Sequence, residues 1–127
     1  MIVIIYKRRL YMRELVKVAK ALSDETRIRM LKLLLEKDIC VCEMEEIFPL
    51  SSSQLSRNLK MLMEVGFLKR WREGKCVVYI ADCENCNRYC RTLLNMVRDS
   101  FNDSEVTRSD RAKLQKVIED QIREKRK

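Results

Sequence analysis

The sequence predicts a fold of the α+β class that is mostly α, and three observations lead to that class. Apolar residues recur at helical spacing along most of the 127-residue chain. The single proline, Pro49, separates a short apolar segment from a longer one, as a turn between two helices does. Residues 67–80 instead form two short runs around Glu73-Gly74, which predicts a two-stranded hairpin.

Two helices are expected in the first third of the chain. The first follows an apolar stripe from Leu15 to Leu22. Ser23 and Asp24 can then accept hydrogen bonds from the free amide groups at the start of the second helix. That helix is expected to run until Asp38, with three charged residues on its solvated faces: Arg27, Lys32 and Glu36.

A helix-turn-helix is expected next. A short helix over residues 42–48 leads to the proline, and Ser51 and Ser52 provide a turn and a cap for a longer helix. The apolar stripe of that longer helix is Leu55, Leu59 and Leu62. Gly66 ends it, and the hairpin follows directly. This order predicts a winged helix-turn-helix with a two-stranded wing, followed by helices with apolar faces over 90–101 and 114–122.

Composition limits the partners. Lys and Arg outnumber Asp and Glu by 27 to 19, and the resulting net charge of +8 favours a polyanion. The apolar start, residues 1–6, is too short to span a membrane and is followed by Lys7-Arg8-Arg9, so we expect a cytoplasmic protein that does not bind membranes. In that reducing compartment the six cysteines are expected to be metal ligands, redox sensors or buried small hydrophobes.

The outward face of the longer helix carries side chains that can read bases. Arg57 can bind guanine through two hydrogen bonds, and Gln54 can bind adenine in the same way. Serine hydroxyl groups and Lys60 suit phosphates. Double-stranded DNA is therefore the expected partner, although a solvated helix face beside an ordinary hairpin would show the same charges. The candidate DNA contacts are Ser52, Ser53, Gln54, Ser56, Arg57, Asn58 and Lys60 on the helix and Arg70, Arg72 and Lys75 on the wing.

The cysteines form two groups in the sequence. Cys40 and Cys42 stand at the head of the helix-turn-helix, where a helix N-terminus lowers the pKa of a thiol. Cys83, Cys86 and Cys90 form the second group, and their spacing allows them to converge where a loop enters a helix. Thiolates select soft ions, and the chain has no histidine, the commonest ligand for zinc and nickel. All five cysteines are candidate metal ligands.

Other roles for the second group stay open. Together with Cys76 its three thiolates could form a structural zinc site. Alternatively, Cys90 packs in a dimer interface and its neighbours are incidental. Cys76 itself is expected to pack on the wing beside Trp71.

Several blocks, in the same order, resemble the ArsR/SmtB family of metal-responsive winged-helix repressors over residues 12–101. The matching blocks are Ala21-Leu22-Ser23-Asp24-Glu25-Thr26-Arg27, Asp38-Ile39-Cys40-Val41-Cys42-Glu43-Met44, Leu50 to Leu59, Gly66-Phe67-Leu68, Arg72-Glu73-Gly74-Lys75 and Val78-Tyr79. The resemblance implies a homodimer that binds a palindromic operator, with N- and C-terminal dimerisation helices at Leu15–Leu22 and Cys90–Phe101. It also implies three parts: an N-terminal extension (1–11), a DNA-binding and dimerisation domain (12–101) and a C-terminal helical extension (102–127).

The resemblance does not reach the two extensions, residues 1–11 and 102–127. Residues 1–11 are expected to be an added strand, a dimer-exchanging arm or the result of an upstream translation start. Residues 114–127 are expected to add buried surface to the dimer, and their basic end also permits contact with DNA. Asn58 stands where many members of the family carry histidine.

The resemblance also implies which ion the protein senses. Arsenic-responsive members use a Cys-Val-Cys segment and a third cysteine three residues later, which here is Glu45. The predicted function is a repressor of a metal or metalloid resistance operon that leaves its operator when arsenite or antimonite binds thiolates. The alternatives are a sensor of cadmium, lead or zinc and a thiol redox or persulfide sensor. An enzyme is not expected, because a thiol reductase would explain neither the recognition helix nor the wing.

Overall fold

The computed structural model describes the backbone of residues 2–82, 84 and 86–126. The helices in this part of the chain are α1 (Ile2–Leu22), α2 (Glu25–Glu36), α3 (Val41–Ile47), α4 (Ser52–Glu64), α5 (Cys90–Asp99) and α6 (Glu105–Arg126). The strands are β1 (Ile39–Cys40), β2 (Leu68–Glu73) and β3 (Cys76–Ala81). The predicted class, mostly α with a winged helix-turn-helix, is confirmed.

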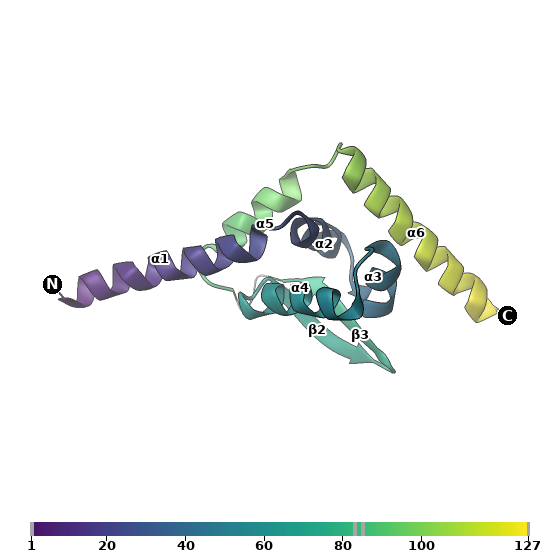
Figure 1. Cartoon of the computed structure of the whole chain (residues 1–127), viewed down its shortest axis with the longest axis horizontal. Coiled ribbons are helices and arrows are strands. Elements are labelled where there is room, and N and C mark those ends of the chain that lie inside the picture. The colour runs from purple at the N-terminus through teal and green to yellow at the C-terminus, as the bar shows by residue number, and fades with distance from the viewer. Residues whose placement is uncertain (1, 83, 85, 127) are drawn as a thin grey trace.

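The two terminal helices extend from opposite sides of a body formed by α2, α3, α4 and the sheet (Figure 1). Helix α1 begins at Ile2, so residues 2–11 belong to this helix. The prediction of an added strand there is wrong. Arg88 lies 3.5 Å from the ring centroid of Tyr11 and pairs with Glu14, which ties the loop before α5 to the middle of α1. Within the described residues, no helix has the length and apolar character needed to cross a membrane.

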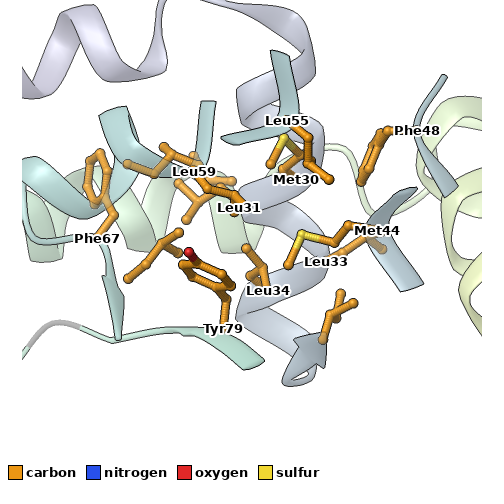
Figure 2. Packing of buried hydrophobic residues seen from close by; sticks show 14 of the residues in the cluster. Met30, Leu31, Leu33, Leu34, Met44, Phe48, Leu55, Leu59, Phe67 and Tyr79 are labelled. Atoms are coloured by element: carbon orange, nitrogen blue, oxygen red, sulfur yellow. The ribbon is translucent and has the colours of Figure 1, made fainter. Parts of the chain in front are cut away.

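Helix α2 lies at the centre of the hydrophobic core. Leu31 and Leu34 are completely buried, and side chains from α3, α4 and the sheet surround them (Figure 2). The α4 residues predicted to face inward, Leu55 and Leu59, are among these neighbours. Burying a leucine side chain contributes about 1.5–3 kcal/mol, so this cluster fixes α4 against the body.

Lys32 is buried, and its predicted place on a solvated face is wrong. Only 4% of the residue is exposed. Its ammonium group donates hydrogen bonds to the backbone carbonyls of Val97 and Arg98 and to Asn102 Oδ1, at 2.6–3.1 Å. The cation thus satisfies carbonyls at the C-terminal end of α5, where the helix dipole also favours positive charge.

Helix α6 packs on its own chain. Leu114 and Val117 belong to the core, and α6 lies beside α3 (Figure 1). Arg29 donates two hydrogen bonds, of 2.8 and 2.9 Å, to the buried Asp110 carboxylate, and Arg111 pairs with Glu36. Leu114 and Val117, which were expected to be buried in a dimer, are therefore already buried within one chain.

The wing has a third strand that sequence reasoning did not predict. In the antiparallel sheet the strand order is β1-β3-β2, with Cys40 opposite Val78 and Glu73 opposite Cys76. Gly74 has a φ of 59°, a value that glycine adopts without strain, in the two-residue turn at the tip. The pairing of β1 with β3 attaches the wing to the entrance of α3.

Candidate nucleic-acid interface and thiol site

Helix α4 presents a polar face to solvent. Ser51 caps the helix by accepting a hydrogen bond from the backbone amide of Gln54 at 3.2 Å. Opposite the buried leucines, the exposed residues are those predicted for DNA contact: Ser52, Ser53, Gln54, Ser56, Arg57 and Lys60. An exposed helix of 13 residues with this face has the dimensions of an element that enters a major groove.

Several of the predicted contacts have partners within the chain: Lys60 pairs with Glu64 at 3.9 Å, Arg70 lies beside Tyr79, and Gln54 and Asn58 accept hydrogen bonds. The Gln54 carboxamide oxygen accepts a hydrogen bond from the backbone amide of Ser51, which completes the cap. Asn58 is half-buried, and its Oδ1 accepts a hydrogen bond of 3.2 Å from Arg27. The same Arg27 side chain donates to the backbone carbonyls of Lys20 and Ala21, so Arg27 joins the end of α1 to α4. Arg27 is half-buried instead of fully solvated.

A hollow of about 550 Å³ separates α4 from the wing. Arg57, Lys60 and Arg70 contribute cations to its lining, and Arg70 lies 3.4 Å from the hydroxyl of Tyr79. The other predicted wing contacts, Arg72 and Lys75, are exposed near the tip. The cations of α4 and of the wing therefore share one side of the molecule, where they can meet phosphates.

Three thiols gather where β1, α3 and β3 meet. Cys42 Sγ lies 2.9 Å from Cys40 Sγ and 3.6 Å from Cys76 Sγ. All three sulfur atoms lie within 4.8 Å of one another. Asp38, Glu43, Glu73 and Gln121 line the same hollow. Among the described residues, these three cysteines are the one group of at least three thiols or carboxylates close enough to hold a metal ion.

Burial raises the pKa of the Cys40 thiol, and its contact with Cys42 raises it further. The hydrogen bond with Cys42 also raises the pKa of Cys76. The expectation that a helix N-terminus would lower the pKa of Cys40 is therefore wrong, because burial and the contact with Cys42 outweigh the backbone hydrogen bond that lowers this pKa. Sulfur atoms at this spacing suit a soft, thiophilic ion.

The second group of cysteines has a different environment. Cys83 lies outside the described residues. Cys86 is half-buried in the loop before α5 and packs against the core. Cys90 is the first residue of α5, is completely buried, and its thiol donates to the backbone carbonyl of Val65 at 3.2 Å. Cys86 and Cys90 therefore do not share a helical face, and Cys90 occupies a core position.

Sequence reasoning placed Cys76 beside Trp71 and did not count it with Cys40 and Cys42. Cys76 meets Cys40 and Cys42 because β1, a strand of two residues, pairs with β3. Alternation along β3 could have indicated that Cys76 and Val78 face the same side. Nothing in the sequence indicated that Ile39-Cys40 forms a strand, since two residues are too few for a periodic pattern.

Comparisons with known sequences agree with this arrangement. Residues 24–70 match the family described as "Bacterial regulatory protein, arsR family". The chain is 40% identical over 73 residues to a cadmium resistance transcriptional regulatory protein CadC homolog of Staphylococcus aureus, covering 57% of this chain and 60% of that protein. It is 43% identical over 63 residues to the arsenic resistance transcriptional regulator ArsR1 of Pseudomonas putida, covering 49% of each. The match thus spans about half to three fifths of these relatives.

Solved structures give the same fold. Reduced HlyU from Vibrio cholerae superposes with a TM-score of 0.59 at 23% identity, covering 72% of this chain and 92% of that one. An ArsR-like transcriptional regulator from Rhodococcus superposes with a TM-score of 0.56 at 29% identity, covering 68% of this chain and 81% of that one. Both likenesses support a winged-helix arrangement.

Proposed function

Because this chain belongs to the ArsR/SmtB family of winged-helix regulators, we propose that it represses a metal or metalloid resistance operon. In this proposal the protein holds its operator in the ion-free state and releases it when arsenite or antimonite binds to Cys40 and Cys42. The observation that carries the proposal is the position of these two thiols directly before and within α3, the first helix of the DNA-reading unit.

The exposed face of α4 supports operator recognition. Arg57 is exposed and borders the cationic hollow, so it can reach a guanine edge through two hydrogen bonds. Lys60, Arg72 and Lys75 are exposed and suit phosphates. A net charge of +8 adds a sequence-independent attraction to DNA.

Exposed apolar side chains on α1 and α5 support a homodimer. Met12 is 67% exposed, and Val16, one turn further along the helix, is 51% exposed. On α5, Met96 is 55% exposed. Apolar side chains on these helices, where the family makes its dimer contacts, need a partner surface. A twofold axis there would place two α4 helices on successive major grooves of a palindromic site, roughly 34 Å apart.

The chemistry of thiols supports a metalloid signal. When arsenous acid condenses with a thiol, one As–O bond breaks and one As–S bond forms, and the thiol proton leaves with the hydroxyl as water. Arsenic stays trivalent, so no oxidant or reductant is needed. Soft donors without histidine suit this ion, and they also suit cadmium and lead. An ion that binds the DNA-free form more tightly shifts the population toward release.

The test is fluorescence anisotropy with a DNA fragment from upstream of the protein's own gene, under reducing, anaerobic conditions. Arsenite or antimonite is expected to weaken DNA binding on the order of a hundredfold. Release by cadmium, lead or zinc alone would change the assigned signal to a divalent metal. Release by an oxidant, reversed by a reductant, would indicate a redox sensor. Persistent binding with every ion and oxidant would refute regulation by these thiols.

Arg57→Ala separates DNA recognition from ion sensing. We expect this variant to lose about 1–3 kcal/mol of specific DNA binding, because a guanine contact is lost. The ion affinity, measured by titration calorimetry, is expected to change less than about threefold, because Arg57 lies away from the thiols and distant sites act independently. Arg108→Ala is the matched control, because it removes an exposed cation from α6 and leaves the face of α4 intact.

A further inference from the structure

The third thiol of the cluster comes from the wing, 34 residues after Cys42. We propose that Cys40, Cys42 and Cys76 of one chain form a three-thiolate site for a soft metal or metalloid ion, and that the bound ion acts on DNA by fixing the wing. This inference rests on the function proposed above, since it adds a ligand and a means of regulation to the same site. The carboxylate of Glu45 is then not needed as the third ligand.

The spacing of the sulfur atoms suits one ion. Two thiolates that bind a zinc ion at about 2.3 Å lie roughly 3.8 Å apart in a tetrahedral site. The Cys42–Cys76 distance of 3.6 Å is close to that value, and the Cys40–Cys42 distance of 2.9 Å is shorter. Shifts of about an ångström therefore bring these sulfur atoms to the separation that one ion requires. A third sulfur from the wing removes the need for a ligand from a second chain.

The register of the sheet explains why these thiols meet. Cys40 pairs with Val78, and side chains of paired residues lie on the same face of a sheet. Cys76 is two residues before Val78 on β3, so it faces the same side. Cys40 and Cys76 are therefore diagonal neighbours across two strands, and Cys42 adds the third sulfur from the first turn of α3. Backbone pairing at two positions brings the three thiols near one another, and a bound ion would then restrain the tip of the hairpin as well.

The position of Cys76 links the ion to the DNA-binding surface. Cys76 pairs with Glu73 across the turn and follows Lys75, a candidate phosphate contact. An ion that binds Cys76 and Cys42 ties the tip of the hairpin to α3. The orientation of Arg72 and Lys75 is then set by the ion site. Carboxylates line the hollow, but they are hard donors, so a soft ion binds the sulfur atoms.

Two arsenicals that differ in the number of thiols they bind test the inference. Arsenite condenses with three thiols and releases three water molecules. Phenylarsine oxide carries one carbon on arsenic, so it binds two thiols and releases one water. We compare the native 127-residue chain with Cys76→Ser and Cys42→Ser, each in the reduced state. Tryptophan fluorescence and As–S absorbance measure binding, and a chromogenic disulfide counts the remaining thiols. Far-UV circular dichroism checks the fold, and Cys76→Ala is the second variant.

In Cys76→Ser the arsenite affinity is expected to fall at least about 100-fold, because an intramolecular third bond is lost. The affinity for phenylarsine oxide is expected to change less than about threefold, because this arsenical engages two thiols and both Cys40 and Cys42 remain. Operator release by arsenite, relative to the ion-free affinity of the same variant, should be lost as well. The native chain should lose three titratable thiols on binding arsenite.

Three outcomes would overturn the inference. If a folded Cys76→Ser protein keeps the native arsenite affinity while Cys42→Ser loses it, the wing thiol is not a ligand and the proposed function stands. If Cys76→Ser loses affinity for both arsenicals, Cys76 belongs to a two-thiol pair and the three-thiolate site is wrong. If the native chain binds arsenite through three thiols but keeps its operator, the wing does not transmit the signal and the proposed function fails too.

Discussion

The two groups of cysteines differ in how the fold uses them. Cys40, Cys42 and Cys76 lie in a hollow at the junction of β1, α3 and β3, with their sulfur atoms within 4.8 Å of one another. Cys90, in contrast, is completely buried at the start of α5, where its thiol donates to a backbone carbonyl. The first group is the proposed ligand set for an ion, whereas Cys90 fills the core as a small hydrophobe.

This difference shows that strand pairing can gather ligands better than proximity in the sequence. Cys86 and Cys90 are only four residues apart, yet one lies in a loop and the other begins a helix. Cys76 is 34 residues from Cys42, yet their sulfur atoms are 3.6 Å apart. The antiparallel register of β1 and β3 brings Cys76 close to Cys42. The spacing of Cys86 and Cys90 does not place them on one helical face, because α5 begins only at Cys90.

The largest effect is expected for Cys42→Ser, which tests whether the first group of cysteines, and not the second, binds the ion. Cys42 is the sulfur between the other two, so its loss should lower arsenite affinity on the order of a hundredfold, or about 2.7 kcal/mol, and abolish operator release. Anisotropy and fluorescence titrations measure both effects. If Cys42→Ser remains fully inducible, the segment with Cys83, Cys86 and Cys90 becomes the sensor, and the contrast between the two groups is reversed.

A smaller effect, on stability instead of sensing, is expected for Cys90→Ser. The substitution places a hydroxyl group among apolar side chains, although the hydrogen bond to Val65 can persist. We expect the free energy of unfolding to fall by about 1–2 kcal/mol, with a lower midpoint in urea. Arsenite affinity of the folded protein should stay within about threefold of native, since distant substitutions act independently. A hundredfold loss of affinity would place Cys90 among the ligands.

The smallest effect on sensing is expected for Asp110→Asn, which weakens the contact between α6 and α2. The amide keeps one oxygen for Arg29 but loses the charge of the carboxylate, so about 1.5–3 kcal/mol of stability should be lost in urea unfolding. Gln121 of α6 lines the hollow of the thiols, but the sheet holds them. Arsenite affinity is therefore expected to change less than about threefold. A larger change would mean that α6 shapes the site. Glu119→Gln, at an exposed position of α6, is the matched control.

Much of the fold could be predicted from the sequence, because its main elements have clear local causes. The cap at Asp24, the stripe on α4 and the glycine in the wing turn all act over a few residues. Lys32 was misplaced because helical spacing alone does not show that a cation meets the end of a distant helix. Likewise, the role of α6 depended on which surface its apolar stripe would meet.

The candidate sites could be predicted in part, for the same reason. The exposed face of α4 follows from the position of Leu55 on its buried side. Cys40 and Cys42 stood out through their spacing, but Cys76 depended on a register between segments far apart in the chain. A strand of two residues is too short to show a periodic pattern, so nothing in the sequence of β1 indicated that it pairs with β3.

The single-chain origin of the three sulfur atoms has a consequence for how a cell would detect the ion. A site shared between subunits would come apart on dilution, so its apparent affinity would depend on protein concentration. A site within one chain keeps the same ion affinity on dilution. The affinity of the regulator for its ion would then not depend on how many copies a cell contains.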